Sequence, residues 1–337
     1  MTLILSQYSD STTDIVIDWL NYYGHSFIRL NGEDLLKKGA ISFSENKFIF
    51  KIEGKETESE NINSVWFRRA YSSNALYNLN EQKLNKSNLQ IFTSHISKEA
   101  AAIYRLMECN LSDSYWLNSF TTSFTDKNRY LSIAKNIGLQ IPNSYLFSDK
   151  SDLSDCLKRK GELIMKPSSD CVAFFSHEKD EAYTMYTEVI NSNFLRDIPP
   201  TFFPTFFQEK VEKKYEVRAF FLEGKIYSMA IFSQLDSKTS IDFRHYNEET
   251  PNRLCPYKLP KAIEAKIKIL MRQLSLNCGS LDFILSKNGD YIFLEVNPVG
   301  QFGWLSYICN YNIYEEVAKN LIKKDNDYGI KKIRDRK

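Results

Sequence analysis

Two acidic residues lie in the two strands of a predicted β-hairpin in the last part of the chain. Asn288-Gly289 separates two apolar runs, 280–286 and 291–297. Asn-Gly is the strongest short hairpin signal, because a two-residue type I′ turn needs positive φ at both positions. Counting outward from a loop of these two residues places Asp282 directly opposite Glu295. Like charges that face each other across a β-ladder repel, so the hairpin needs a compensating positive charge.

A site for a hard divalent cation would supply that charge. Asn297 follows Glu295 by two residues, so both side chains point to the same face of the strand. Carboxylate and amide oxygens on one face favour Mg²⁺, which keeps several waters and is completed by substrate phosphates. The sequence therefore predicts that Asp282, Glu295 and Asn297 hold a metal ion. The alternative is a solvated hairpin that carries two unrelated acids.

Composition and charge exclude several other classes of protein. The 337 residues include 44 Lys+Arg and 42 Asp+Glu, a formal net charge of +2, and this balance argues against a nucleic-acid binder. The six cysteines include no Cys-x-x-Cys pair, so a zinc ribbon or a thioredoxin-type site is not expected. No signal peptide or long apolar run is present. We expect a cytoplasmic protein with reduced thiols and no membrane contact.

The elements that must position these residues begin with an α/β unit. Residues 3–5 and 25–30 predict strands, and residues 14–23 between them have apolar residues at helical spacing. A strand, a helix and a second strand in this order build a parallel sheet. Further strands are predicted at 41–54 and 62–69, and a long helix at 81–109. The predicted first domain is 1–118.

The remaining chain predicts a strand-rich region with a few helices. Helices are expected at 126–137 and 261–275, and Pro167 ends a short strand at 162–167. Glu223-Gly224 is a second hairpin candidate. The charged tail after Lys323 is expected to fray. Two more domains are predicted, at 119–205 and 206–328.

The order of these residues over 120–300 resembles the ATP-grasp ligases. Glu295-Val296-Asn297-Pro298, together with Asp282, resembles the metal-binding signature of that family. The resemblance implies ATP and one or two Mg²⁺ ions as cofactors. It also implies an α/β fold that is α+β in its ATP-grasp part. An N-terminal Rossmann-like pre-ATP-grasp domain would precede a central and a C-terminal α+β subdomain, with the nucleotide between those two and the metal site in the C-terminal one.

The same resemblance implies an ATP site. Lys127 and Lys166 match lysines that contact the ATP phosphates, and Glu216 matches the carboxylate that binds the ribose. Arg218 matches the arginine that steadies the γ-phosphate and the developing acyl phosphate. Arg244 is the second candidate catalytic residue, for a phosphate or a substrate carboxylate. The hinge whose backbone reads the adenine edge is matched by Gln208, Glu209, Lys210 and Val211.

Each match has an ordinary structural alternative. Lys166 could end a surface strand, Glu216 and Arg218 could form a salt bridge within one strand, and Arg244 could lie in an exposed loop. Residues 168–171 contain no glycine, which departs from many ATP-grasp enzymes and leaves the loop over the phosphates undefined.

Local sequence is similar to one branch of the family, the peptide maturases that make graspetides, the microviridin-type cyclised peptides. The similarity lies in Asn297-Pro298-Val299-Gly300-Gln301-Phe302-Gly303-Trp304, Val65-Trp66-Phe67-Arg68-Arg69 and Asp242-Phe243-Arg244. The N-terminal segments 11–14 and 29–32 resemble the grasp-with-SPASM subgroup. Alternation places Arg68 and Arg69 on opposite faces of a strand, so one of them would enter a cleft, and the sequence does not decide which.

The resemblance implies an ADP-forming ligase. ATP would convert Asp or Glu side chains of a ribosomal precursor peptide, leader plus core, to acyl phosphates. Ser or Thr hydroxyls or Lys amines would then attack, to form macrocyclic esters or amides. Cations and metal ligands suffice for this chemistry, without a covalent enzyme nucleophile. The expected partners also include a second copy of the chain and a SPASM-domain protein. Three alternatives remain: a ligase for amino acids or small molecules, a non-catalytic nucleotide- or peptide-binding module, and a kinase.

Overall fold

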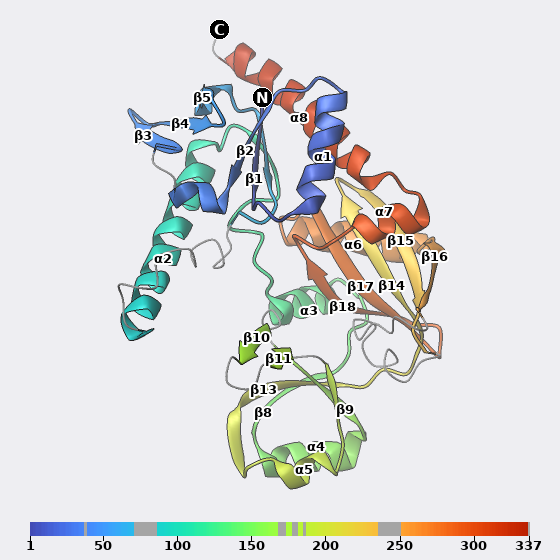
Figure 1. Ribbon diagram of the computed structural model, residues 1–337. Coiled ribbons are helices and arrows are strands. Elements are labelled where there is room, and N and C mark those ends of the chain that lie inside the picture. The colour runs from blue at the N-terminus through green and yellow to red at the C-terminus, as the bar shows by residue number, and fades with distance from the viewer. Residues whose placement is uncertain are drawn as a thin grey trace. The chain divides into compact units, whose positions relative to one another are not determined.

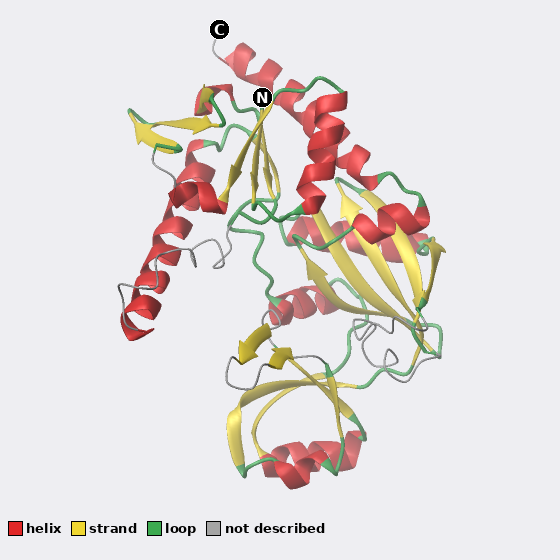
Figure 2. Ribbon diagram, viewed as in Figure 1, coloured by secondary structure: helices red, strands yellow, loops and turns green. Residues whose placement is uncertain are grey.

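The computed structural model describes residues 1–36, 39–70, 86–167, 173–176, 181–184, 187–234 and 251–335 (Figure 1). The chain forms two compact units, and each contains both helices and strands (Figure 2). The first unit is Met1–Phe124, Ser275–Cys278 and Gln301–Lys337, and the second is Thr125–Leu274 and Gly279–Gly300. The three domains expected from the sequence stay a prediction.

A parallel sheet forms the centre of the first unit, as the alternation of strand and helix predicts. Its strand order is β2-β1-β6-β7, and all three pairs are parallel. The strands are β1 (Thr2–Ser6), β2 (Phe27–Asn31), β6 (Ser64–Phe67) and β7 (Tyr115–Leu117). Helix α1 (Ser11–Tyr22) connects β1 to β2, and the Asp10 carboxylate caps it by accepting from the N–H of Thr12.

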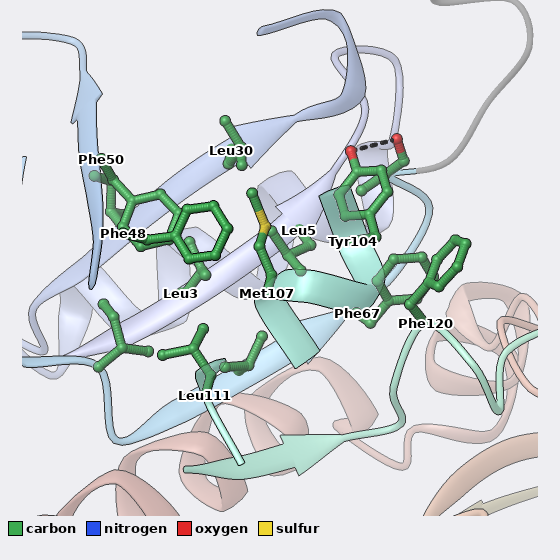
Figure 3. Packing of buried hydrophobic residues seen from close by; sticks show 14 of the residues in the cluster. Leu3, Leu5, Leu30, Phe48, Phe50, Phe67, Tyr104, Met107, Leu111 and Phe120 are labelled. Atoms are coloured by element: carbon green, nitrogen blue, oxygen red, sulfur yellow. Dashed lines mark hydrogen bonds between the residues drawn. The ribbon is translucent and has the colours of Figure 1, made fainter. Parts of the chain in front are cut away.

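Helix α2 (Lys86–Asn110) covers this sheet with an apolar face. Tyr104 and Met107 of α2, and Leu111 directly after it, pack against strand residues such as Leu3 and Leu5 (Figure 3). The hydroxyl of buried Tyr104 donates to the carbonyl of Ala70 at 2.9 Å, so the polar end of this core residue is satisfied.

A small antiparallel sheet accounts for the predicted strand region 41–54. It consists of β3 (Ile41–Ser44), β4 (Lys47–Ile52) and β5 (Lys55–Glu58) in that order. Two short 3₁₀ helices lie beside it in the chain, Gly32–Leu36 and Ser59–Asn61.

The long last helix contradicts the expectation that the chain frays after Lys323. Helix α8 (Ile313–Asp335) follows α7 (Gly303–Cys309) and contacts α1 and β6. Asp325 on α8 is 6% exposed, and its carboxylate lies 2.8 Å from the amino group of Met1. An ion pair between the partly exposed Met1 amino group and the buried Asp325 carboxylate therefore holds the region that charge composition alone assigned to a mobile tail.

The second unit contains an antiparallel sheet with strand order β12-β9-β13-β8. The strands are β8 (Ser144–Asp149), β9 (Leu163–Lys166), β12 (Glu188–Ile190) and β13 (Thr201–Glu209). The neighbouring helices are α4 (Lys150–Lys160) and α5 (Phe194–Asp197), and β10 (Ala173–Ser176) pairs with β11 (Glu181–Thr184). Leu153 and Leu157 of α4 pack with Leu163 and Phe207. This hydrophobic core covers one face of the sheet with α4.

A larger sheet in the same unit has the strand order β16-β15-β14-β17-β18. Its strands are β14 (Lys213–Leu222), β15 (Lys225–Phe232), β16 (Arg253–Tyr257), β17 (Cys278–Ser286) and β18 (Tyr291–Asn297). The hairpin predicted at Glu223-Gly224 is confirmed, since Leu222 pairs with Lys225. Helices α3 (Lys127–Asn136) and α6 (Lys261–Gln273) belong to the second unit as well, and α3 contacts β18. Among the described residues, no helix is long and apolar enough to cross a membrane.

The β17–β18 hairpin has the predicted pairing of acids but not the predicted loop. The N–H of Ser286 donates to the carbonyl of Asp290, so the loop is the three residues 287–289 rather than Asn288-Gly289. A β-bulge then shifts the register at Asp282/Phe283, and beyond it Asp282 pairs with Glu295. The bulge inserts one residue, Leu294, into β18 and offsets the longer loop. The facing carboxylates are therefore confirmed, and the two-residue turn is wrong.

Candidate active site

The two facing carboxylates share one face of the large sheet. Leu281 and Val296 point to the opposite face, where both are fully buried. Asn297 is two residues beyond Glu295 in the regular part of β18 and pairs with Ser280, so its side chain lies on the face of the acids. The structure brings the three predicted metal ligands together on this face.

Positive side chains from two other elements contact these acids. Arg218 of β14, the strand next to β17, places Nη1 2.6 Å from Oδ2 and 2.8 Å from Oδ1 of Asp282. Both side chains are buried. Lys127, the first residue of α3, lies with Nζ 3.5 Å from Oε2 of Glu295. An arginine and a lysine therefore offset the repulsion expected between the two carboxylates. The resemblance to ATP-grasp ligases predicts phosphate contacts for both of these residues.

The turn after Asn297 needs glycine. The Asn297 side-chain oxygen accepts from the N–H of Val299 at 3.0 Å, and the N–H of Gly300 donates to the Asn297 carbonyl at 3.1 Å. A Cβ at Gly300 would lie 2.5 Å from the Cβ of Ser280. Close approach of this turn to β17 therefore fixes the end of the strand that carries Glu295 and Asn297.

The donor set fits Mg²⁺. Two carboxylates and one amide are hard oxygen ligands, and Mg²⁺ accepts a small number of protein ligands because it keeps waters. No group of three or more His, Cys, Asp or Glu side chains in the described part of the chain could hold a metal. A structural zinc site, which needs four such ligands, is therefore not found there.

A cavity of about 140 Å³ lies at the predicted hinge. Lys210 and Val211, which follow β13, line it together with Ile164, Glu212, Lys213, Gln234 and Ile284. The N–H of Lys287 in the hairpin loop donates to the carbonyl of Glu212 at 3.0 Å. The hinge is thus held against the hairpin that carries the acids.

Residues of β9 and β13 alternate between this cavity and the α4 core. Gln208 pairs with Ile164, which lines the cavity, and these two residues share a face. The Gln208 amide nitrogen donates to Ser144 at 3.0 Å, and its side-chain oxygen is buried with no hydrogen-bond partner in the described residues. Lys166 is two residues after Ile164, so it points to the same face at the end of β9. These positions are compatible with the roles expected of both residues.

Glu209 points to the other face of β13. Its carboxylate accepts from Asn143 at 2.7 Å and from the Tyr145 hydroxyl at 3.0 Å, and it lies 3.1 Å from the ammonium of Lys160. Burial raises the pKa of Glu209, but these hydrogen bonds outweigh burial and hold the pKa below its ordinary value. Burial and the hydrogen bond to Glu209 raise the pKa of Tyr145 to about 12. The Glu209 side chain thus joins β13 to β8 and α4, and the expected contact of the hinge backbone with adenine stays a prediction.

Glu216 is buried beside a lysine that the sequence reading missed. The ammonium of Lys213 donates to the Glu216 carboxylate, which also accepts from Ser233 at 3.4 Å. Lys213 lines the cavity at the hinge. The sequence could not predict the contact between Lys213 and Glu216, because residues three apart in a regular strand point to opposite faces. Arg244 and residues 168–171 lie outside the described residues.

Of the two arginines after β6, Arg68 is the buried one. Its Nε lies 3.1 Å from Oδ2 of Asp10, and Nη2 donates to the Gln301 side chain at 3.2 Å. The guanidinium lies 5.7 Å from the ring centre of Phe302. Burial lowers the pKa of Arg68, although Asp10 acts in the opposite direction. Arg68 of the segment 65–69 therefore contacts Gln301 and Phe302 of the segment 297–304 inside the first unit.

Comparisons with solved structures decide the fold. A RiPP-associated ATP-grasp ligase from Chryseobacterium gregarium, in complex with ADP and a leader and core peptide, has a TM-score of 0.83 at 23% identity over 96% of each chain. The chain has the ATP-grasp fold. Macrocyclase MdnC from Microcystis aeruginosa MRC, bound with precursor peptide MdnA, has a TM-score of 0.80 at 24% identity over 96% of this chain and 100% of MdnC.

A third ATP-grasp structure completes the comparison. The ligase PsnB, complexed with a phosphomimetic variant of its minimal precursor, Mg and ADP, has a TM-score of 0.77 at 17% identity over 96% of this chain and 98% of PsnB. No protein-family model and no curated protein sequence matches the chain. The expected fold class is thus confirmed for nearly the whole chain, while the roles of individual residues and the grasp-with-SPASM subgroup stay predictions.

Proposed function

We propose that the protein is an ATP-dependent ligase that forms crosslinks within a ribosomal precursor peptide. The observation that carries the proposal is the acidic face of an ATP-grasp fold, on which Asp282 and Glu295 contact Arg218 and Lys127. Phosphoryl transfer needs such a set, because negative charge spreads over the transferred group in the transition state. The cavity at the hinge supports a nucleotide in the same unit.

In the proposed first step, a peptide carboxylate oxygen attacks the γ-phosphorus of ATP. The bond to the bridging oxygen breaks, ADP leaves, and an acyl phosphate remains. Arg218, Lys127 and Lys166 stabilise the developing charge. Mg²⁺ held by Asp282, Glu295 and Asn297 would add positive charge beside the transferred group.

In the second step, a Ser or Thr hydroxyl or a Lys amine of the same peptide attacks the acyl carbon. The carbon–oxygen bond to phosphate breaks, inorganic phosphate leaves, and the nucleophile loses its proton. The product is an ester or an amide ring. Arg244 is proposed as a further contact to phosphate or to a substrate carboxylate. We also propose the cytoplasm as location, and a second copy of the chain and a SPASM-domain protein as partners.

Support for the peptide substrate comes from two sources. The segments at 65–69 and 297–304 look like those of peptide maturases, and the similar solved structures contain precursor peptides. A ligase for amino acids remains the main alternative.

Mass spectrometry tests the proposal. The purified protein is incubated with ATP, Mg²⁺ and each short peptide encoded beside its gene that is rich in Ser or Thr and in Asp or Glu. We expect each crosslink to remove the mass of one water from the peptide. A gain of one phosphoryl group would indicate a kinase instead. ADP release with free amino acids, but not with the peptide, would favour the small-molecule ligase, and no ADP release would favour a binding module.

A further inference from the structure

We propose that the outer edge of β8, with the groove beside it, binds an extended acidic peptide segment that adds to the sheet as a further strand. The site lies within the second unit. None of the residues that line the groove is a predicted nucleotide or metal residue. The inference goes beyond the proposed function, because it requires neither ATP nor a metal ion.

Strand β8 is one edge of the sheet β12-β9-β13-β8. The N–H of Glu209 donates to the carbonyl of Asn143 at 2.9 Å, and the register with β13 continues without a shift to Phe147. Hydrogen-bonded and non-hydrogen-bonded residues alternate along an antiparallel pair. The N–H and C=O groups of Ser144 and Leu146 therefore point away from β13, and such a row of groups is a template for another strand.

The side chains of β8 leave this edge open. Edge strands are usually protected by charged residues or Pro, and residues 144–148 contain neither. Leu146 is 62% exposed, while Tyr145 and Phe147 on the other face pack against the α4 core. The α4 core thus holds one face of the strand, and its outer edge is accessible in the described part of the chain.

A groove of about 600 Å³ lies beside the first part of β8. Its wall is the extended segment 139–145, and its described charged lining residues are Lys135 at the end of α3 and Lys160 at the end of α4. The carbonyl of Gln140 accepts from the N–H of Phe293 in β18 at 2.8 Å. The wall is therefore fixed to one sheet at Gln140 and to the other through β8.

The two lysines favour an acidic occupant. Lys160 lies 3.1 Å from the carboxylate of Glu209, whereas Lys135 is exposed and forms no ion pair among the described residues. A peptide carboxylate can pair with Lys135 directly and can share Lys160 with Glu209. Because alternate residues of an extended peptide point to the same face, acids at every second position would lie toward the groove.

Charged groups at the border of the groove do not cancel this preference. The carboxylate of Asp290 accepts from the Gln140 side chain at 3.2 Å, and the ammonium of Lys266 donates to the Gly138 carbonyl at 2.5 Å. One acid and one lysine are thus added to the charges inside the groove. The excess of positive charge remains.

Fluorescence anisotropy with the full chain, in the absence of ATP and Mg²⁺, tests the inference. The probe is a labelled, end-blocked peptide of about ten residues that alternates Thr and Glu, a length that spans an edge strand. We expect it to bind the wild type about tenfold more tightly than the same peptide with Gln in place of Glu. Lys135→Gln should weaken probe binding about threefold, and Lys135→Gln/Lys160→Gln about tenfold.

A matched control removes two lysines elsewhere in the second unit. Lys261 and Lys268 are exposed on α6, so Lys261→Gln/Lys268→Gln should bind the probe as the wild type does. Equal probe affinities of the wild type and Lys135→Gln/Lys160→Gln would overturn the inference, and so would an equal loss in the α6 control.

A proline at the outer edge tests strand addition separately from charge. Leu146→Pro removes an N–H that faces away from β13, so it should weaken probe binding about fivefold, the effect of about one hydrogen bond. Leu146→Ala keeps this N–H and should bind the probe nearly as the wild type does. Equal losses in the two variants would show that the Leu146 side chain, and not the strand edge, binds the peptide.

Hydrogen exchange of the wild type keeps the test decisive if Leu146→Pro does not fold. Saturating probe should slow exchange of the Ser144 and Leu146 amides, and unchanged exchange there would refute strand addition. A dimer that forms without probe and dissociates in Leu146→Pro would show that a second copy occupies the edge, which also refutes the inference. No reaction is involved, so failure of the crosslinking assay would reject the proposed function and leave the binding result intact.

Discussion

At the scale of single residues, the site is defined by contacts between strands that are far apart in sequence. Asp282 is a site candidate by residue type and spacing, and Arg218 by its resemblance to an arginine of the ATP-grasp ligases, but the contact between the two depends on β14 lying next to β17. No local pattern specifies that neighbour. The sequence could therefore predict which residues carry charge at the site, and could not predict that arginine and aspartate contact each other.

Asp282→Asn should both abolish the reaction and destabilise the protein. The substitution removes a proposed metal ligand and the carboxylate that the buried guanidinium of Arg218 contacts. Loss of one partner from a buried ion pair costs about 3–5 kcal/mol. Peptide dehydration by mass spectrometry and urea unfolding check the two effects.

The apolar double variant Arg218→Met/Asp282→Leu separates these effects. Replacement of both partners of a buried pair is often close to neutral for stability, so this variant should regain most of the stability that Asp282→Asn loses while remaining inactive. A double variant as unstable as Asp282→Asn would show that the pair is not the source of the loss.

At the scale of elements, the β17–β18 hairpin shows how far local signals reach. Asn-Gly predicts a turn, and alternation predicts the facing acids, and both are present. The loop is one residue longer than expected and the bulge at Leu294 restores the register. Two local deviations thus cancel at Asp282 and Glu295. Bulges depend on packing rather than on a sequence code, so the sequence alone could not reveal this compensation.

Gly300→Ala should distort the end of β18. Its new methyl group would meet the Ser280 Cβ at 2.5 Å, and overpacking of this kind costs about 1–3 kcal/mol. We expect a lower thermal midpoint and weaker Mn²⁺ binding with ADP. The double variant Gly300→Ala/Ser280→Gly removes the contacting Cβ and should recover Mn²⁺ binding. No recovery would mean that the contact with the Asn297 carbonyl dominates.

The carboxylate of Glu209 gives the four-stranded sheet β12-β9-β13-β8 of the second unit a defined acid sensitivity. Its pKa is lowered in the folded protein from the ordinary value of 4.5, so the stabilisation it provides is complete above that value and is lost as pH falls through the lower folded pKa. The difference in unfolding free energy between wild type and Glu209→Gln should be constant near neutral pH and shrink below about pH 4.5. Urea unfolding across this range measures it, and a pH-independent difference would contradict the assignment.

At the scale of the whole molecule, the long-range assembly of the chain was the least predictable feature. Residues 301–337 come a short turn after β18, the strand that carries Glu295 and Asn297, yet they belong to the first unit together with Met1–Phe124. Asp325 explains part of this result, because a charged residue in a charged segment is buried against the amino group of Met1. Composition could not distinguish such a helix from a mobile tail. Fold class, by contrast, follows from element order and motif order, which are spread along the chain.

All predicted nucleotide and metal residues in the described chain, from Lys127 to Asn297, lie in the second unit. Nucleotide binding should therefore slow hydrogen exchange in that unit selectively. When ADP is present at about 100 times its dissociation constant, the free energy of any local unfolding that releases ADP rises by about 2.7 kcal/mol. In the presence of Mg²⁺, we expect slower exchange in β14 and β17 and little change in β1 and β2. Inorganic phosphate at the same concentration is the control and should protect neither unit. Protection confined to the first unit would place the nucleotide elsewhere, because a ligand protects the amides of the structure that must open to release it.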